Sequence, residues 1–160
     1  MTNKLEQARS CMTIEDFKIG DEFTKTYQVD NEMVRKFAEI SGDWNPVHHD
    51  AEFAKGTVFK RQIAHGMISV AQFSGIFGMD MPGLGAIWTQ QNAKFLAPVY
   101  LDLPYTAKVV VEEVDPEKNT VVFETTCLDA DGNLVLTGKG ILKPLPLKVK
   151  QKMSFKVDAK

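Results

Sequence analysis

Cysteine is scarce in this sequence of 160 residues, with one at position 11 and one at position 127. Two cysteines so far apart cannot build a disulfide framework and lack the close spacing of a zinc-binding pair. The first ten residues, MTNKLEQARS, contain no apolar core of the kind that a secretory signal has. Free thiols together with the lack of an export signal predict a protein of the reducing cytoplasm.

The sequence also lacks an excess of either charge and a long apolar run. Lysine and arginine number 19 against 21 aspartate and glutamate residues, which gives a formal net charge of −2. A nucleic-acid-binding domain normally carries a clustered basic excess, so we expect no nucleic-acid partner. The longest apolar stretch, at 65–77, is interrupted by glycine and serine, which argues against a membrane span. The hydrophobic content of 44% instead suits a single domain that buries a core.

Apolar periodicity and turn residues divide the chain into three parts. Residues 1–12 predict a flexible arm, residues 13–146 one domain, and the basic residues 147–160 a flexible, solvated tail. Within the domain, Asp30 is a good N-cap for a helix that Ser41 and Gly42 end. The expected elements are helices over 33–40 and 65–77, a polar loop over 43–50, a helical turn over 51–55, and strands over 22–29, 86–96, 105–114, 120–128 and 134–142.

The segment HGMISVAQFSGIF at 65–77 is apolar on nearly every helical face. A helix without a polar face has to be surrounded by protein. Its glycine, alanine and serine residues permit a sheet to approach closely. Because about four antiparallel strands follow this helix, we expect an α+β fold in which a curled antiparallel sheet wraps one wholly buried central helix.

The loop at 41–50 concentrates side chains that can move protons. Asp43 and His48 lie five residues apart around a turn stiffened by Asn45 and Pro46, so both can point at one water molecule. Adding water to an unsaturated thioester needs a base for the water, an acid for the carbon beside the carbonyl, and donors at the thioester oxygen. Taken alone, Asp43 is also a common turn former and His48 a common structural histidine.

The start of the apolar helix suits the need for hydrogen-bond donors at the thioester oxygen. The first N–H groups of a helix have no partner inside it, and the helix dipole favours negative charge at that end. Gly66 has no side chain, so a thioester oxygen can reach its N–H. His65 beside it can also simply anchor the helix start.

These segments together resemble a known family. The sequence DWNPVHHD at 43–50, followed by IAHGM at 63–67, FSG at 73–75 and FLAPVY at 95–100, resembles the MaoC-like family of R-specific enoyl-CoA hydratases. The resemblance covers roughly residues 14–144. One departure is Leu101-Asp102-Leu103-Pro104, where family members commonly have Gly-Asp, so the turn geometry there is open.

The resemblance implies a hot-dog fold, in which a long helix lies inside a curved antiparallel sheet, and a homodimer. It implies that Asp43 and His48 form the catalytic pair, supported by Asn45. It also implies that Gly66 donates to the thioester oxygen and that Ser74 shapes the site. The substrate is a thioester of CoA or of acyl carrier protein. Neither a metal nor an organic cofactor is needed, because the thioester is acidifying enough once its oxygen is stabilised.

The working hypothesis is reversible syn hydration of a trans-2-enoyl-CoA to an (R)-3-hydroxyacyl-CoA. Asp43 then acts as base toward water and His48 as proton donor to the α-carbon, with the reverse assignment left open. The further candidate substrate contacts are His65, Met67, Phe73, Ile76 and Phe77 for the acyl thioester, and Lys55, Lys60 and Arg61 for the CoA phosphates. The last three are as readily explained as ordinary solvated side chains.

Three other functions remain in view. A hot-dog thioesterase commonly carries a carboxylate on its central helix, and none occurs here before Asp80. A metal site from His48, His49, Asp50 and His65 lacks a helical His-x-x-x-His pair. A non-catalytic acyl-CoA-binding subunit would have no need of the Asp43–His48 pair.

Overall fold

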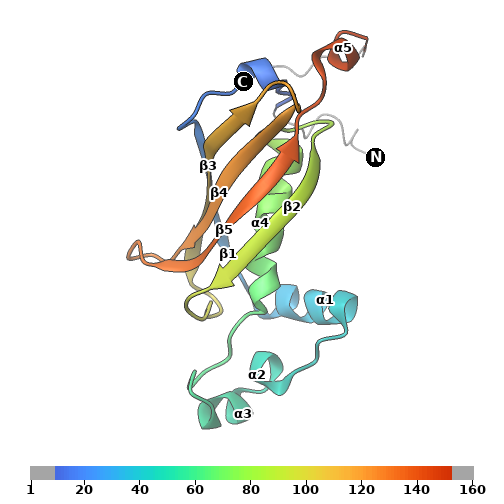
Figure 1. Cartoon of the computed structure of the whole chain (residues 1–160). Coiled ribbons are helices and arrows are strands. Elements are labelled where there is room, and N and C mark those ends of the chain that lie inside the picture. Colours follow the sequence, from blue (N-terminus) through green and yellow to red (C-terminus); the bar gives the residue numbers. More distant parts are fainter. Residues whose placement is uncertain (1–9, 153–160) are drawn as a thin grey trace.

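A single five-stranded antiparallel sheet forms the body of the computed structural model, which describes residues 10–152. The strands lie in the order β1-β3-β4-β5-β2, so β1 and β2 are the two edges. The bounds are Glu22–Gln28 for β1, Ile87–Phe95 for β2, Pro104–Asp115 for β3, Thr120–Leu128 for β4 and Leu134–Lys143 for β5. The sheet curves around one long helix, α4 (Gly66–Met79), as Figure 1 shows.

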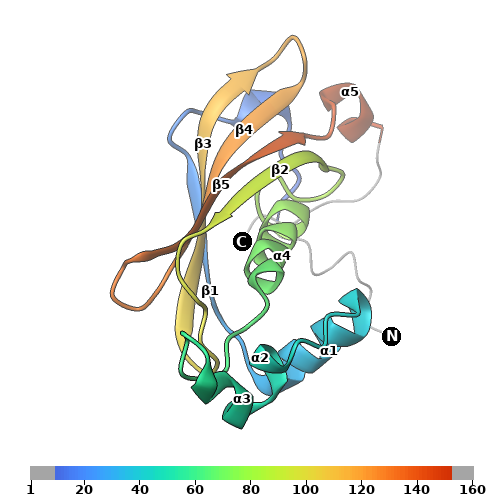
Figure 2. The ribbon, with the colours of Figure 1, turned by 60° about the horizontal axis from the view of Figure 1, so that its bottom comes forward.

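The remaining helices are short and lie away from the middle of the sheet. Helices α1 (Asn31–Ser41), α2 (Pro46–His49) and α3 (Ala51–Gly56) gather beyond the N-terminal end of α4 (Figure 2). A 3-10 turn (Ile14–Asp16) and α5 (Leu147–Lys150) complete the described elements. This α+β arrangement is the hot-dog fold that the resemblance implied, and the expected strands and both expected helices are confirmed to within a few residues.

Local sequence explains where the elements begin and end. The Asp30 carboxylate accepts a hydrogen bond of 2.8 Å from the Met33 N–H and so caps α1. At the other end Gly42 adopts a left-handed backbone (φ 77°), and its N–H donates to the Ala38 carbonyl. In β3 the buried residues alternate along the strand (Tyr105, Ala107, Val109 and Val111), which is the period of a strand with one face on the core.

The core lies between α4 and the concave face of the sheet. Phe73, Ile76 and Phe77 of α4 are almost fully buried there. The Phe77 ring lies 5.2 Å from the ring of Phe123 on β4, centroid to centroid. A Cβ atom at Gly140 of β5 would lie 3.3 Å from the Phe77 ring, so glycine at this position lets the ring approach the strand.

One expectation about α4 is wrong for the single chain. The sheet covers only one side of the helix, and Met67, Ala71, Ser74 and Gly78 form an exposed strip along the opposite side. Met67 keeps 52% of its surface exposed. Sequence periodicity could not reveal this strip, because its residues are as small or apolar as those that face the sheet.

Other differences concern the loop and the termini. Residues 43–50, expected as a polar loop, contain α2, because Pro46 is suited to the first helical position and Asn45 caps it. Residues 10–12 are not a loose arm, since the Met12 N–H donates to the Pro82 carbonyl and Cys11 forms an isolated antiparallel β-bridge with Gly83. Part of the expected tail forms α5, and the rest of the arm and tail (1–9, 153–160) lies outside the described residues. No helix within residues 10–152 is both long and apolar enough to span a membrane.

We predict that Phe123→Ala lowers the free energy of unfolding by about 3–5 kcal/mol, because it leaves a cavity where Phe17 and Phe77 now pack. Phe53→Ala is the matched control, since this phenylalanine is 50% exposed, and we expect a change below about 1 kcal/mol. Urea denaturation followed by circular dichroism measures both values. Equal losses in the two variants would contradict the core described above.

Candidate active site

A largely apolar pocket of about 430 Å³ opens at the N-terminal end of α4, and we call it the apolar pocket. Its walls come from Phe95 at the end of β2 and residues 96–99 after it, from Val135 and Leu136 of β5, and from Phe59, Ile63, Ala64, Gly66, Met67 and Ser69. His48 and Gly66 both belong to its lining. The pocket therefore joins the histidine of the 43–50 segment to the start of the central helix.

Asp43 and two histidines form a compact cluster beside this pocket. Asp43 Oδ2 lies 4.0 Å from His48 Nε2 and 3.9 Å from His65 Nε2. The His48 side chain is largely buried, whereas the Asp43 side chain is about half exposed (51%). A water molecule fits between groups at such a separation, since each hydrogen bond spans roughly 3 Å.

A hydrogen bond to the main chain fixes the orientation of His48. Its Nδ1 lies 2.8 Å from the Ile63 carbonyl oxygen. A carbonyl oxygen can only accept, so Nδ1 carries the proton and donates it. Nε2 is then the atom turned toward Asp43, free to exchange a proton on that side.

Asn45 ties the carboxylate to α2. Its backbone N–H donates to Asp43 Oδ1 at 3.2 Å, and its side-chain oxygen accepts from the Val47 N–H at 3.2 Å. One residue thus orients Asp43 and caps the short helix that carries His48. The supporting role in catalysis expected of Asn45 stays a prediction.

Gly66 begins α4, and no side chain caps this end of the helix. Gly66 and Met67 both line the pocket, so the start of α4, with the positive end of the helix dipole, lies at the pocket. A Cβ atom on Gly66 would lie 2.7 Å from Cε1 of Phe95, whose ring covers the glycine. Glycine at this position therefore lets the Phe95 ring lie directly against the backbone where α4 begins.

His65 lies behind His48 and is not in the wall of the apolar pocket. It is 3% exposed, its ring centroid lies 3.8 Å from that of His48, and its Nε2 donates to the Asp43 carbonyl at 2.9 Å. Burial lowers the pKa of His65, with the neighbouring His48 acting in the same direction. We conclude that His65 is neutral and holds the Asp43 backbone.

The structure separates the other predicted site residues. Met67 lines the apolar pocket, whereas Phe73, Ile76 and Phe77 are packed into the core. Ser74 lies on the exposed strip of α4 and does not reach the apolar pocket within the described chain. The contacts predicted for Phe73 and Ser74 are therefore not brought together with the Asp43–His48 pair.

Several lining residues were not singled out from the sequence. They include Phe59, Leu96, Val99 and Ser69. The Ser69 hydroxyl accepts a hydrogen bond of 2.8 Å from Tyr27, a phenol whose pKa burial raises well above its usual range. The apolar run at 95–99, which begins at the last residue of β2 and is exposed over its first three residues, is the one signal that could have indicated a binding wall.

The ligand atoms of Asp43, His48 and His65 all lie within 4.8 Å of one another, as a metal site would require. Two carbonyl groups, however, occupy His65 Nε2 and His48 Nδ1, which leaves His48 Nε2 as the imidazole nitrogen that faces the Asp43 carboxylate, while His65 Nδ1 is buried without a hydrogen-bond partner. A structural zinc site needs four protein ligands and a catalytic one three. His49 and Asp50 add none, since Asp50 caps α3 through the Glu52 and Phe53 N–H groups.

The fold and this cluster define a hot-dog domain with an Asp–His pair beside the N-terminus of its central helix. The chain belongs to the MaoC-like domain family, whose model matches residues 17–132. It is 41% identical over 125 residues to an (R)-specific enoyl-CoA hydratase of Rhodospirillum rubrum, covering 78% of this chain and 86% of the relative. It is 33% identical over 132 residues to the (R)-specific enoyl-CoA hydratase of Aeromonas caviae, covering 82% and 98%. The solved structure of an (R)-hydratase from A. caviae superposes with a TM-score of 0.80 at 32% identity, covering 82% of this chain and 99% of that one.

We predict that the protein loses stability as the pH falls through roughly 6.5, the ordinary histidine value. The unfolded chain protonates His65 there while the folded chain keeps it neutral, so the unfolded state binds more protons and acid favours it. His65→Gln should flatten the dependence of the unfolding free energy on pH by at most about 1.4 kcal/mol per pH unit. Urea titrations from pH 8 to pH 5 measure the slope, with His49→Gln as control. An unchanged slope would show that His65 is not the group held neutral.

Proposed function

We propose that this protein adds water reversibly to trans-2-enoyl-CoA thioesters to give (R)-3-hydroxyacyl-CoA. The observation that carries the proposal is the position of Asp43 and His48, 4.0 Å apart, beside an apolar pocket that begins at Gly66. The names of the relatives, which are (R)-specific enoyl-CoA hydratases, favour the same reaction. Two side chains and a water molecule supply the reacting groups besides the thioester, and the mechanism calls on no metal or organic cofactor.

Asp43 and His48 divide the two proton movements between them. The Asp43 carboxylate takes a proton from a water molecule held between the two side chains, and the oxygen bonds to the β-carbon. His48, protonated on Nε2, gives its proton to the α-carbon on the same face, which makes the addition syn. The proton on Asp43 then returns to His48, so the cycle closes without an outside acid or base. Dehydration follows the same path in reverse.

The main chain supplies the hydrogen-bond donor that the thioester oxygen needs. As the double bond opens, negative charge develops on the thioester oxygen and needs a donor already in place. Gly66 at the start of α4 lines the pocket, with the positive end of the helix dipole there, and its N–H is the donor assigned to this oxygen. The acyl chain then lies against the apolar residues 95–99 and the neighbouring part of β5.

We predict that Asp43→Asn and His48→Gln each lower kcat for crotonyl-CoA by about two to four orders of magnitude, because each removes one proton transfer. His49→Gln, which changes the adjacent histidine, should retain activity. Loss of the enoyl-thioester absorbance measures turnover, chiral analysis identifies the product, and circular dichroism checks folding. Release of free CoA thiol with the enoyl band intact would make the protein a thioesterase. Binding of crotonyl-CoA without either reaction would make it a non-catalytic subunit.

We also propose that the protein is a homodimer of the cytoplasm. A groove of about 660 Å³ runs between the exposed strip of α4 and the edge strand β2, lined by Met67, Ala71, Trp88 and Phe95. An edge strand carries unpaired N–H and C=O groups, and an apolar groove beside it favours a second copy that extends the sheet. Both cysteines are free thiols, which fits a reducing compartment.

We predict that Ala71→Arg converts the dimer into a monomer, because an unpaired charge would then be buried at the groove. Ala130→Arg, in the exposed hairpin between β4 and β5, makes the same change away from the groove and should leave the dimer intact. Sedimentation velocity measures the mass of wild type and both variants. A monomeric wild type, or a dimeric Ala71→Arg variant, would contradict the proposed interface.

A further inference from the structure

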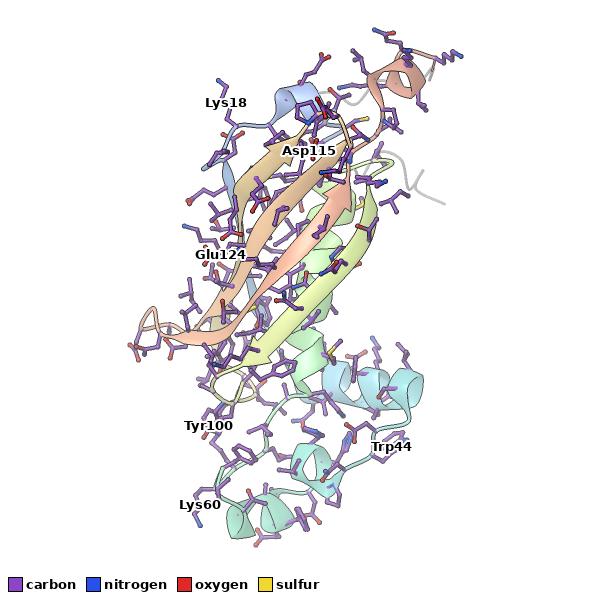
Figure 3. All side chains as sticks on the ribbon, in the orientation of Figure 1. Lys18, Trp44, Lys60, Tyr100, Asp115 and Glu124 are labelled. Carbon is purple, nitrogen blue, oxygen red and sulfur yellow. The ribbon has the colours of Figure 1, made fainter. Side chains whose placement is uncertain are left out.

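A second hollow, of about 280 Å³, lies at the end of the molecule that carries α3 and differs in character from the apolar pocket. Its lining includes Lys55, Lys60 and Arg61, with one carboxylate, Asp102, and we call it the basic pocket. Lys60 and Tyr100 lie at this end in Figure 3, far from Lys18. Three cations around one hollow contrast with the net charge of −2 of the whole chain.

Two of these cations lack a charged partner within residues 10–152. Lys55 pairs with Glu52 at 2.5 Å, but neither Lys60 nor Arg61 has a carboxylate within ion-pair distance in the described chain. Neutral groups hold Arg61 instead, because its guanidinium lies 4.7 Å from the Tyr100 ring centroid and donates to the Leu101 carbonyl. The Arg61 charge is thus fixed in position and left available to an anion.

The backbone around the basic pocket is unusual. Lys60 and Asp102 have φ angles of 62° and 61°, in the left-handed region that side chains disfavour. Asn119 is the one other such non-glycine residue within residues 10–152, and it lies in a turn between strands. Unfavourable backbone conformations cluster at ligand sites, where surrounding structure maintains them.

The two hollows share one stretch of chain. Phe59 and Ile63 line the apolar pocket, and the residues between them, 60–62, line the basic pocket. The Ile63 carbonyl accepts the hydrogen bond from His48, so this stretch also orients the catalytic histidine. Three residues span at most about 11 Å, less than the extended pantetheine arm of CoA. A thioester beside His48 therefore has its phosphates within reach of Lys60 and Arg61.

We infer that the basic pocket binds the phosphate groups of the CoA half of the substrate through Lys60 and Arg61, an inference that rests on the proposed function. Lysine supplies a point charge and arginine two parallel donors for phosphate oxygens. A concave hollow of this size suits a small ligand, whereas an acyl carrier protein would need a broad patch. The enzyme therefore acts on CoA thioesters in preference to carrier-protein thioesters.

The experiment compares Lys60→Glu with wild type on crotonyl-CoA and on crotonyl-pantetheine, which lacks the nucleotide. We expect KM for crotonyl-CoA to rise about tenfold with kcat within about twofold, because a charge-assisted contact is lost away from the reacting atoms. Crotonyl-pantetheine should be turned over equally by both proteins. Lys18→Glu, which makes the same charge change at the opposite end of the molecule, should leave both KM values unchanged (Figure 3).

Direct binding separates this inference from the proposed reaction. Titration calorimetry with free CoA should give a weaker affinity for Lys60→Glu than for wild type, whether or not either protein turns substrate over. Equal CoA affinities, or an equal rise in KM for crotonyl-pantetheine, would overturn the inference and leave the hydratase proposal standing. A preference of wild type for crotonyl-acyl-carrier-protein, lost in Lys60→Glu, would also overturn it. If wild type hydrates no thioester but CoA binding is still weakened by Lys60→Glu, the proposed reaction is wrong and the inference about the phosphate site stands.

Discussion

The packing of α4 into the curved sheet is the contact on which the rest of the molecule depends. Phe73, Ile76 and Phe77 bury one side of the helix in the core, where Phe77 packs against Phe123 of β4 and glycine at 140 lets it approach β5. Burial of such side chains is the main favourable term in folding. Once the helix axis is set, its first residue, Gly66, has a fixed position at one end of the sheet, and the site is assembled around that end.

Two histidines connect the segments that make the site. His48 donates to the carbonyl of Ile63, and His65 donates to the carbonyl of Asp43. Each of the two segments therefore accepts a hydrogen bond from a histidine ring of the other. These bonds cross between residues 43–50 and residues 63–66, and they orient the groups that the proposed reaction uses. The proposed function gives the chemical role to His48 and a positioning role to His65, the more buried ring, whose pKa burial lowers.

Much of the fold could be predicted from local sequence, because caps and strand alternation act over a few residues. Asp30, Gly42 and the alternation along β3 are of this kind. Long-range packing decided what could not be predicted. Phe73 is buried and Ser74 exposed because the sheet covers only one side of α4, and no periodicity in a nearly all-apolar segment specifies which side that is. The apolar wall at 95–99 belongs to the site only because β2 ends beside Gly66.

Met67 and Phe95 line both the apolar pocket and the groove between α4 and β2. A wall shared by two hollows cannot be optimised for one without altering the other. If a second subunit fills the groove, its association constant and the affinity for an acyl group are thermodynamically linked, and each must change the other by the same factor. Evolution of a different acyl preference at these two positions would then be constrained by the need to keep the quaternary assembly.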